Sequence, residues 1–306
     1  MSFGPRGAKM TVGPRGVRKT VGIPGTGAYY TTHSGYGQRR SRRTSQPPAP
    51  TVRPEDRLSL GFFQRLVTPE GEEHFVDGMR EIVLSRETAA LRHFTEAQQL
   101  ADAAFMAGLL SCKRKAFRAA ERFLNAARSK QATLGRYFDK YGVAASVSLA
   151  ITEDVSAIIQ PDHRGVLLAL AEVHQHQRRW KQAAELLKQL YRRDKEDLVV
   201  RLSLAELAVE ESRTKRSCQT AVKLAEGVEN RSEFHAALLM YKGMALHGLG
   251  LLAAARDALT TALRRKKDRS DQLLRAIRYE RALVYEAMGQ ARRARSELGR
   301  VYAEDP

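Results

Sequence analysis

Two hydrophobic periods divide the chain into a short first part and a long second part. Residues 1–37 contain runs such as Val17–Val21 in which apolar and polar residues alternate, and Gly-Pro-x-Gly turns starting at Gly4 and Gly13 precede such runs. This pattern predicts a small antiparallel β-meander. From residue 58 onwards apolar residues recur at helical spacing, so the expected fold class is mainly α with a small N-terminal β module.

One template recurs along the helical part: a small residue, another 12 positions later, an apolar residue 4 further on, and an apolar or small residue 3 beyond that. Its frames are Gly78–Ala90–Phe94–Ala97, Gly108–Ala120–Leu124–Ala127, Ala171–Ala183–Leu187–Leu190, Gly243–Ala255–Leu259–Ala262 and Ala282–Ala294–Leu298–Val301. The small residues predict where two antiparallel helices approach closely, with the apolar residues filling the groove between them. Gly250 and Gly289, each 7 after the first small residue, predict turns. Such hairpins bury their apolar faces only by stacking, which indicates a solenoid.

A β-hairpin insert near 143–160 is expected to interrupt the helical pattern. Residues 142–151 alternate at period two, and Val155–Ile159 follows after Thr152-Glu153-Asp154, as in two paired strands. The insert is expected to cap the first helical block or to supply an edge strand to the N-terminal meander. The predicted domains are a β-meander module (1–37), a disordered basic linker (38–57), a first helical block (58–134), the insert (135–163) and a second helical block (164–306).

The helical frames resemble tetratricopeptide repeats. The last one matches that family's pattern best, through Ala282, Tyr285, Gly289, Ala294 and Pro306. The family's opening tryptophan is not matched and the spacing of the frames drifts, so these are divergent repeats covering most of residues 70–306. The resemblance implies a right-handed α-α superhelix whose groove binds a protein or peptide segment.

The N-terminal segment resembles a second family. Residues 12–16 and 20–30, the latter reading Thr-Val-Gly-Ile-Pro-Gly-Thr-Gly-Ala-Tyr-Tyr, are similar to the second half of a short bacterial domain of unknown function. That family ends in Val-Gly-x-Pro-Gly-Thr-Gly-x-x-Tyr. The match covers about residues 1–32 and lacks the family's opening Phe/Arg-rich strands. The resemblance implies a bacterial origin, but it implies no biochemical activity.

No motif for catalysis or metal binding stands out, and the chain is expected to be neither an enzyme nor a cofactor or small-molecule binder. His174 and His176 are two positions apart, so on a helix they do not share a face and are not expected to ligate one metal ion. Adjacent carboxylates such as Glu72 and Glu73 are expected on solvated faces or at loop ends. Two cysteines among 306 residues fit a reducing compartment, and a cytoplasmic location is expected.

Positive charge is concentrated at the N-terminal end of the chain. Ten of the 52 Lys and Arg residues lie in residues 1–54, which hold no Asp or Glu, and the net charge is +18. A candidate anion-binding arm within this segment consists of Arg39, Arg40, Arg42 and Arg43. Such an arm can attract nucleic acid, which is the alternative partner, while an anionic membrane surface is the least favoured one.

A protein or peptide partner is therefore the leading expectation. The first helix of each repeat lines the groove in such arrays, and polar positions on these helices are candidates for binding. The residues selected on this basis are Tyr241, Lys242, Arg278 and Arg281. An error of one residue in the helical phase moves a side chain by about 100° around the helix.

Overall fold

A computed structural model describes residues 2–3, 8–13, 16–22, 28–34, 58, 60–143, 146–211 and 214–303. The predicted linker at 38–57 lies outside these residues. The chain forms two compact units. The first comprises residues 1–149 and 158–173, and the second comprises residues 150–157 and 174–306.

The N-terminal strands form the predicted antiparallel meander. They are β1 (Ser2–Phe3), β2 (Ala8–Gly13), β3 (Gly16–Gly22) and β4 (Ala28–Ser34). Each strand pairs with the next, and the β2–β3 ladder runs from Ala8↔Val21 to Gly13↔Gly16. β-Branched and aromatic residues dominate β4, as strands favour.

The insert is the predicted β-hairpin, with strands β5 (Ser146–Ala150) and β6 (Ser156–Ile159). β5 pairs antiparallel with β4, Ala28 facing Val147 and Tyr29 facing Ser146. The strands therefore follow one order from β1 to β6 in a single sheet. The expectation that the insert supplies a strand to the meander is confirmed.

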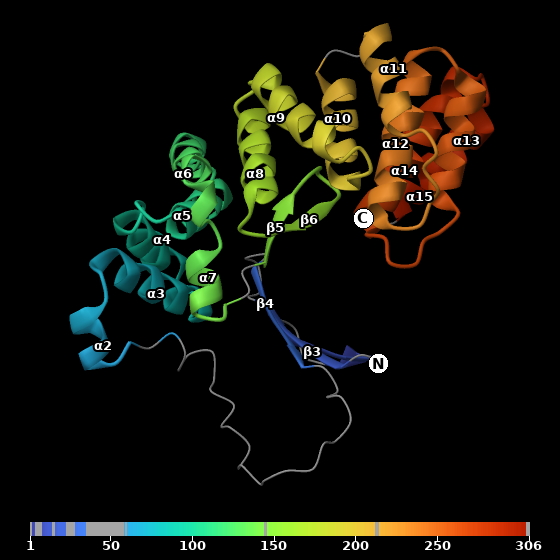
Figure 1. The fold of residues 1–306 in the computed structure, drawn as a ribbon. Coiled ribbons are helices and arrows are strands. Elements are labelled where there is room, and N and C mark those ends of the chain that lie inside the picture. Colours follow the sequence, from blue (N-terminus) through green and yellow to red (C-terminus); the bar gives the residue numbers. More distant parts are fainter. Residues whose placement is uncertain are drawn as a thin grey trace, which may run out of the picture. The chain divides into compact units, whose positions relative to one another are not determined.

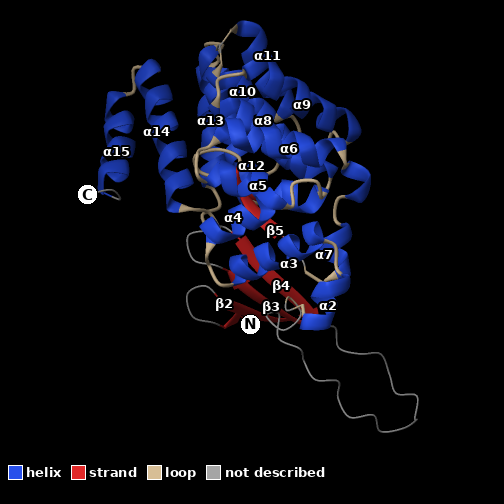
Figure 2. Ribbon diagram, turned by 90° about the vertical axis from the view of Figure 1, so that its left-hand side faces the viewer, coloured by secondary structure: helices blue, strands red, loops and turns tan. Residues whose placement is uncertain are grey.

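Helices make up most of the described chain (Figures 1 and 2). Those that begin in the first unit are α2 (Phe62–Val67), α3 (Glu70–Val83), α4 (Glu87–Glu96), α5 (Ala101–Lys113), α6 (Phe117–Ser129), α7 (Arg136–Lys140) and α8 (His163–His176), with a 3₁₀ turn at Gln131–Thr133. Those of the second unit are α9 (Trp180–Arg193), α10 (Leu198–Glu210), α11 (Lys215–Leu224), α12 (Glu233–Gly248), α13 (Leu252–Leu263), α14 (Asp271–Ala287) and α15 (Ala291–Ala303). No helix among the described residues is long and apolar enough to cross a bilayer.

The small residues of the template mark the close helix–helix contacts, as predicted. A Cβ added to Gly78 would lie 2.7 Å from the ring of Phe94, and one added to Gly108 would lie 2.6 Å from the side chain of Leu124. A Cβ on Gly243 would lie 2.5 Å from Leu259. In each pair the partner is the apolar residue of the same frame. The backbones come this close because no side chain separates them.

The turn inside each hairpin repeats one backbone conformation. The residue 7 positions after the first small residue has a positive φ in all five frames: Ser85 (60°), Lys115 (57°), Arg178 (58°), Gly250 (75°) and Gly289 (72°). The turns at Gly250 and Gly289 are the two that were predicted from the position of glycine in the sequence. The first three have the same left-handed conformation without glycine, although it is unfavourable for a residue with a Cβ.

Candidate functional site

The second unit carries a candidate binding surface on the first helices of its hairpins, α10, α12 and α14. We call it the inner face and define it by Glu206, Tyr241, Ser270, Gln272, Arg275 and Tyr279. The hairpin tip, residues 151–155, belongs to the same unit. Within the tip the Ile151 N–H donates to the Val155 carbonyl at 2.9 Å. The Thr152 hydroxyl accepts from the Val155 N–H at 3.1 Å, so the turn is closed by its own hydrogen bonds.

Two residues of the inner face hold the tip by its main chain. The Gln272 side-chain amide donates to the Glu153 carbonyl at 3.2 Å, and the Ser270 hydroxyl donates to the Asp154 carbonyl at 3.4 Å. Ser270 is placed for this contact because it is the N-cap of α14, where its Oγ also accepts from the Leu273 N–H. Both hydrogen bonds are made to main-chain carbonyl groups, which every peptide carries, and Gln272 also interacts with the Asp154 carboxyl group.

Apolar side chains on both sides of the turn are buried. Ile151 and Val155 are 1% and 2% exposed. Their burial removes β-branched side chains from water. The tip is thus held by two side-chain hydrogen bonds to its main-chain carbonyl groups, and the apolar side chains that flank it are buried.

Carboxylates crowd the same region. The Tyr241 hydroxyl donates to Glu206 at 3.2 Å, linking α12 to α10. The pKa of Glu206 is raised to about 8. Burial is the largest cause, the nearby Glu210, Glu153 and Asp154 add to it, and the Tyr241 hydrogen bond opposes them. Burial and the Glu206 carboxylate also raise the pKa of the Tyr241 hydroxyl. An ionised Glu206 is therefore unfavourable at this position.

Asp154 at the tip experiences the same surroundings. Burial and the neighbouring Glu153 raise the pKa of its carboxyl, with a smaller contribution from Glu233, whereas Gln272 and Arg275 lower it. The effects that raise the pKa exceed those that lower it, so an ionised Asp154 is unfavourable at this position.

The inner face continues along α14 beyond the tip. Arg275 and Tyr279 follow Gln272 by three and seven positions, so the three residues lie on one stripe of the helix. Tyr279 is 47% exposed, which is unusual for a large aromatic side chain in the described part of this chain. An exposed aromatic residue on the same helix stripe as Gln272, whose side chain donates to a main-chain carbonyl, provides a place for a polypeptide segment to bind.

The four residues selected from the sequence occupy different environments. Tyr241 is 6% exposed and faces Glu206, and Lys242 is half-buried beside it on α12. Arg278 is 7% exposed. Arg281 forms an ion pair with Glu297 of α15 at 2.9 Å, because nine residues separate it from Gln272 and turn it to the opposite side of α14. Of these four residues, the structure brings only Tyr241 onto the inner face.

The predicted anion-binding arm, Arg39, Arg40, Arg42 and Arg43, lies outside the described residues. Nucleic-acid binding therefore stays a prediction. Among the described residues, no group of three or more histidine, cysteine or acidic side chains is arranged to hold a metal ion.

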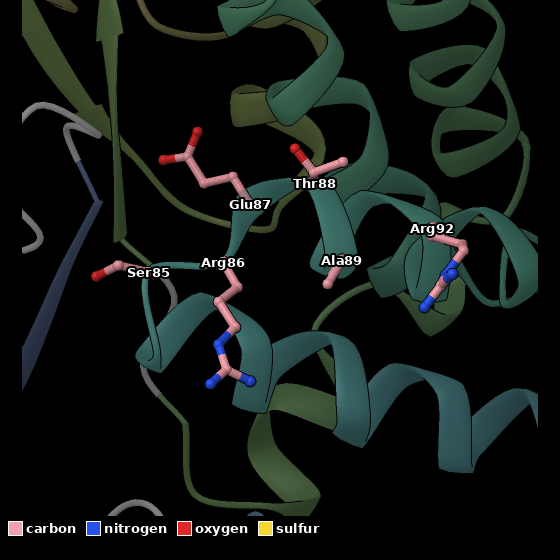
Figure 3. A pocket seen from close by; sticks show the side chains of 6 residues that line it. All are labelled: Ser85, Arg86, Glu87, Thr88, Ala89 and Arg92. Carbon is pink, nitrogen blue, oxygen red and sulfur yellow. The ribbon is translucent and has the colours of Figure 1, made fainter.

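A surface hollow of about 630 Å³ lies at the α3–α4 turn of the first unit (Figure 3). Residues 85–89 and Arg92 line it. Figure 3 shows Arg86 and Glu87 pointing in different directions from this turn. Glu87 pairs with Lys113 at 2.6 Å and Thr88 accepts from Arg114 at 3.2 Å, so these side chains tie one hairpin to the next.

Two carboxylates of the first unit are buried and structural. Asp102 is 0% exposed and accepts backbone N–H bonds from Gly135, Tyr137 and Phe138, at 2.5, 2.7 and 3.4 Å, which holds the start of α7. Glu72 is 5% exposed and binds Lys140 and Tyr141. The expectation that Glu72 lies on a solvated face was wrong, because α7 folds over it. No local sequence pattern distinguishes either residue.

Comparisons with known proteins agree with this architecture. Residues 1–31 match a family described as a protein of unknown function (DUF4236), which confirms an N-terminal domain of unknown function. A search of curated proteins gives no match.

Similar solved structures include the N-terminal domain of the EccA1 ATPase from the ESX-1 secretion system of Mycobacterium tuberculosis. The two share 15% identity over 77% of this chain and 85% of that one, with a TM-score of 0.57. BtubC from P. vanneervenii shares 16% identity over 78% and 91% of the two chains, with a TM-score of 0.51. The helical part thus has a tetratricopeptide-like helical-repeat fold.

Proposed function

We propose that this chain is a non-enzymatic scaffold that holds a segment of a protein partner on the inner face of its second unit. The observation that carries the proposal is the stripe on α14, where Gln272 binds a main-chain carbonyl and Tyr279 is exposed. Helical-repeat arrays bind extended segments along their first helices. Tyr279 rather than Arg278 or Arg281 is the proposed contact residue.

The chemistry of the inner face supports binding rather than catalysis. Glu206 faces a phenol and other carboxylates, an arrangement that does not activate a nucleophile in the way a base and its orienting group do. A reducing, cytosolic location is also proposed, because Cys112 and Cys218 are unpaired thiols. Burial raises the pKa of Cys112 to about 12, so this thiol is not reactive near neutral pH.

Site-specific photocrosslinking tests the proposal. A benzophenone amino acid at position 279 should crosslink one protein in the cells that make this chain, and the crosslink should persist at high salt. Tyr302 is the matched control, because it is an exposed tyrosine (76%) on α15. The reagent at position 302 should not capture the same protein.

A binding measurement completes the test. Tyr279→Ala should weaken binding of the captured protein by about tenfold or more, as buried aromatic anchors do, and Tyr302→Ala should leave it unchanged. Equal crosslinking from both positions, or unchanged binding by Tyr279→Ala, would contradict the proposal.

A further inference from the structure

Outside the N-terminal segment, positive charge is concentrated in the last helical hairpin and the loop before it. Residues 1–54 carry +10 of the net charge of +18. Residues 264–300 hold 12 Lys and Arg against 5 Asp and Glu, and so carry +7 of the remaining +8. The rest of the chain is close to neutral, and the excess lies on the α13–α14 loop, α14 and α15.

Only some of these bases serve the fold. Arg281 and Arg300 pair with Glu297 at 2.9 and 3.5 Å, and Arg269 donates to Asn230 at 3.0 Å. Six others are exposed and make no hydrogen bond or ion pair with any residue that the structure describes. We call these six the basic surface: Arg264, Arg265, Lys266, Lys267, Arg292 and Arg295.

Helix stability does not account for the arginines on α15. The four loop cations follow the C-terminal end of α13, where the helix dipole favours positive charge. Arg292, in contrast, lies in the first turn of α15, which has no acidic residue and where the dipole disfavours a cation. Arg295 follows it by three positions, at which like charges repel. Such a cost is expected of side chains that meet an anion outside the chain.

The basic surface continues along α15 as an open stripe. Arg295, Gly299 and Tyr302 follow Arg292 by three, seven and ten positions, so the four residues lie on one side of the helix. A Cβ on Gly299 would have no atom within 4 Å, and Tyr302 is 76% exposed. The stripe is about 15 Å long.

The loop cations lie at one end of this stripe. α14 and α15 run side by side as the two helices of one hairpin, and the end of α15 returns to the start of α14 (Figures 1 and 2). The loop at 264–267 precedes α14, so it lies at the same end of the hairpin as Tyr302.

We propose that the basic surface binds the phosphodiester backbone of a single-stranded nucleic acid. Arginine donates two parallel hydrogen bonds to a phosphate group, and phosphates recur along such a strand. Tyr302 offers an exposed ring on which an unpaired base stacks. An acidic peptide supplies carboxylates for the arginines but no base for this ring. The basic surface shares no residue with the inner face, so the inference does not rest on the scaffold function.

Binding of a labelled single strand tests the basic surface in the full chain. In every protein used, the four arginines of the predicted arm are replaced by glutamine, so that binding comes from elsewhere in the chain. Arg292→Gln together with Arg295→Gln should weaken binding of a mixed-sequence strand of about 20 nucleotides by about fivefold or more. The slope of log K against log salt concentration should become shallower by roughly 1–2, because each lost phosphate contact removes about 0.7.

A matched pair of substitutions controls for the loss of net charge. Arg192→Gln together with Arg193→Gln removes two exposed arginines from the last turn of α9, in the same unit. This variant should bind the strand within about twofold of the unsubstituted background.

Two further variants test the kind of ligand and the role of the arginines. Tyr302→Leu should weaken binding of the single strand and leave binding of a duplex of the same sequence unchanged, because paired bases do not stack on a side chain. Arg292→Glu should weaken strand binding further than Arg292→Gln. It should also raise the urea midpoint, because it places an acidic residue in the first turn of α15.

Several results would overturn the inference. These are an absence of strand binding in the background without the arm arginines, an equal loss in the control pair, and tighter binding of a polyglutamate peptide of equal charge. Equal effects of Tyr302→Leu on strand and duplex would exclude stacking, and a lower urea midpoint for Arg292→Glu would show that Arg292 serves the fold. None of these results affects the crosslink at position 279, which tests the scaffold function separately.

Discussion

The repeated left-handed turn allows a stability change to be worked out from backbone geometry. Lys115 has φ 57°, and its side chain is exposed. The left-handed conformation costs a residue with a Cβ roughly 1–2 kcal/mol, and glycine avoids this cost. Glycine also gains freedom in the unfolded chain, which costs roughly 0.5–1 kcal/mol. Lys115→Gly should therefore raise the free energy of unfolding by about 0.5–1 kcal/mol.

The control substitutions separate backbone strain from loss of the side chain. Lys115→Ala removes the same exposed side chain and keeps the strained conformation, so it should change stability by less than about 0.5 kcal/mol. Gly250→Lys makes the reverse exchange at the equivalent turn of the second unit, where φ is 75°. It should lower stability by about 1 kcal/mol.

Urea unfolding provides the measurement. Circular dichroism monitors the unfolding of both units, and the fluorescence of the single tryptophan, Trp180, monitors that of the second unit. The midpoint should rise for Lys115→Gly and fall for Gly250→Lys with little change in slope. Backbone strain at these turns would be refuted if Lys115→Ala stabilised the protein as much as Lys115→Gly, or if Gly250→Lys left the free energy of unfolding unchanged.

Three further changes probe the packing, capping and electrostatics of the fold. Gly243→Ala places a methyl 2.5 Å from Leu259 and should destabilise by roughly 1–3 kcal/mol in urea unfolding, whereas Gly299→Ala, with no atom within 4 Å of the new methyl, should stabilise by about 0.5–1 kcal/mol. Asp102→Ala leaves backbone N–H groups at the start of α7 without their acceptor and should cost roughly 2–4 kcal/mol, measured the same way; a loss below about 0.5 kcal/mol would contradict that role. The folded-state pKa of Glu206, raised from 4.5 to about 8, makes stability fall as pH rises between these values. Glu206→Gln should flatten that dependence and stabilise the protein at pH 9 by up to about 5 kcal/mol, at about 1.4 kcal/mol per pH unit, and an unchanged pH profile would refute the assignment.

The hairpin frames were predictable from the sequence because glycine itself enables the close approach. Gly78, Gly108 and Gly243 each precede their apolar partner by 16 positions, and the structure places the two in contact. The turns at Gly250 and Gly289 were predictable for the same reason. Those at Ser85 and Lys115 were not, because the geometry of the hairpin imposes the left-handed conformation on residues that do not favour it.

The inner face was less predictable than the fold. The alternation of residues 142–159 predicts a hairpin, yet nothing near it identifies Ser270, which hydrogen-bonds the tip from 116 residues away. Which side of α14 faces the tip could not be predicted either. Hydrophobic spacing shows where a helix lies in the sequence more reliably than it shows which residues face a given side. Arg281 illustrates the difficulty: a polar residue on a first helix, it pairs with Glu297 inside the hairpin.

The path of the chain between the two units limits how the gene can be divided. The polypeptide leaves the first unit after residue 149, contributes residues 150–157 to the second, returns at 158, and leaves again after 173. A single break anywhere in this stretch gives a fragment that lacks part of one unit. Recombination at one point therefore cannot exchange either half as an intact module, and the two halves are expected to be inherited and lost together.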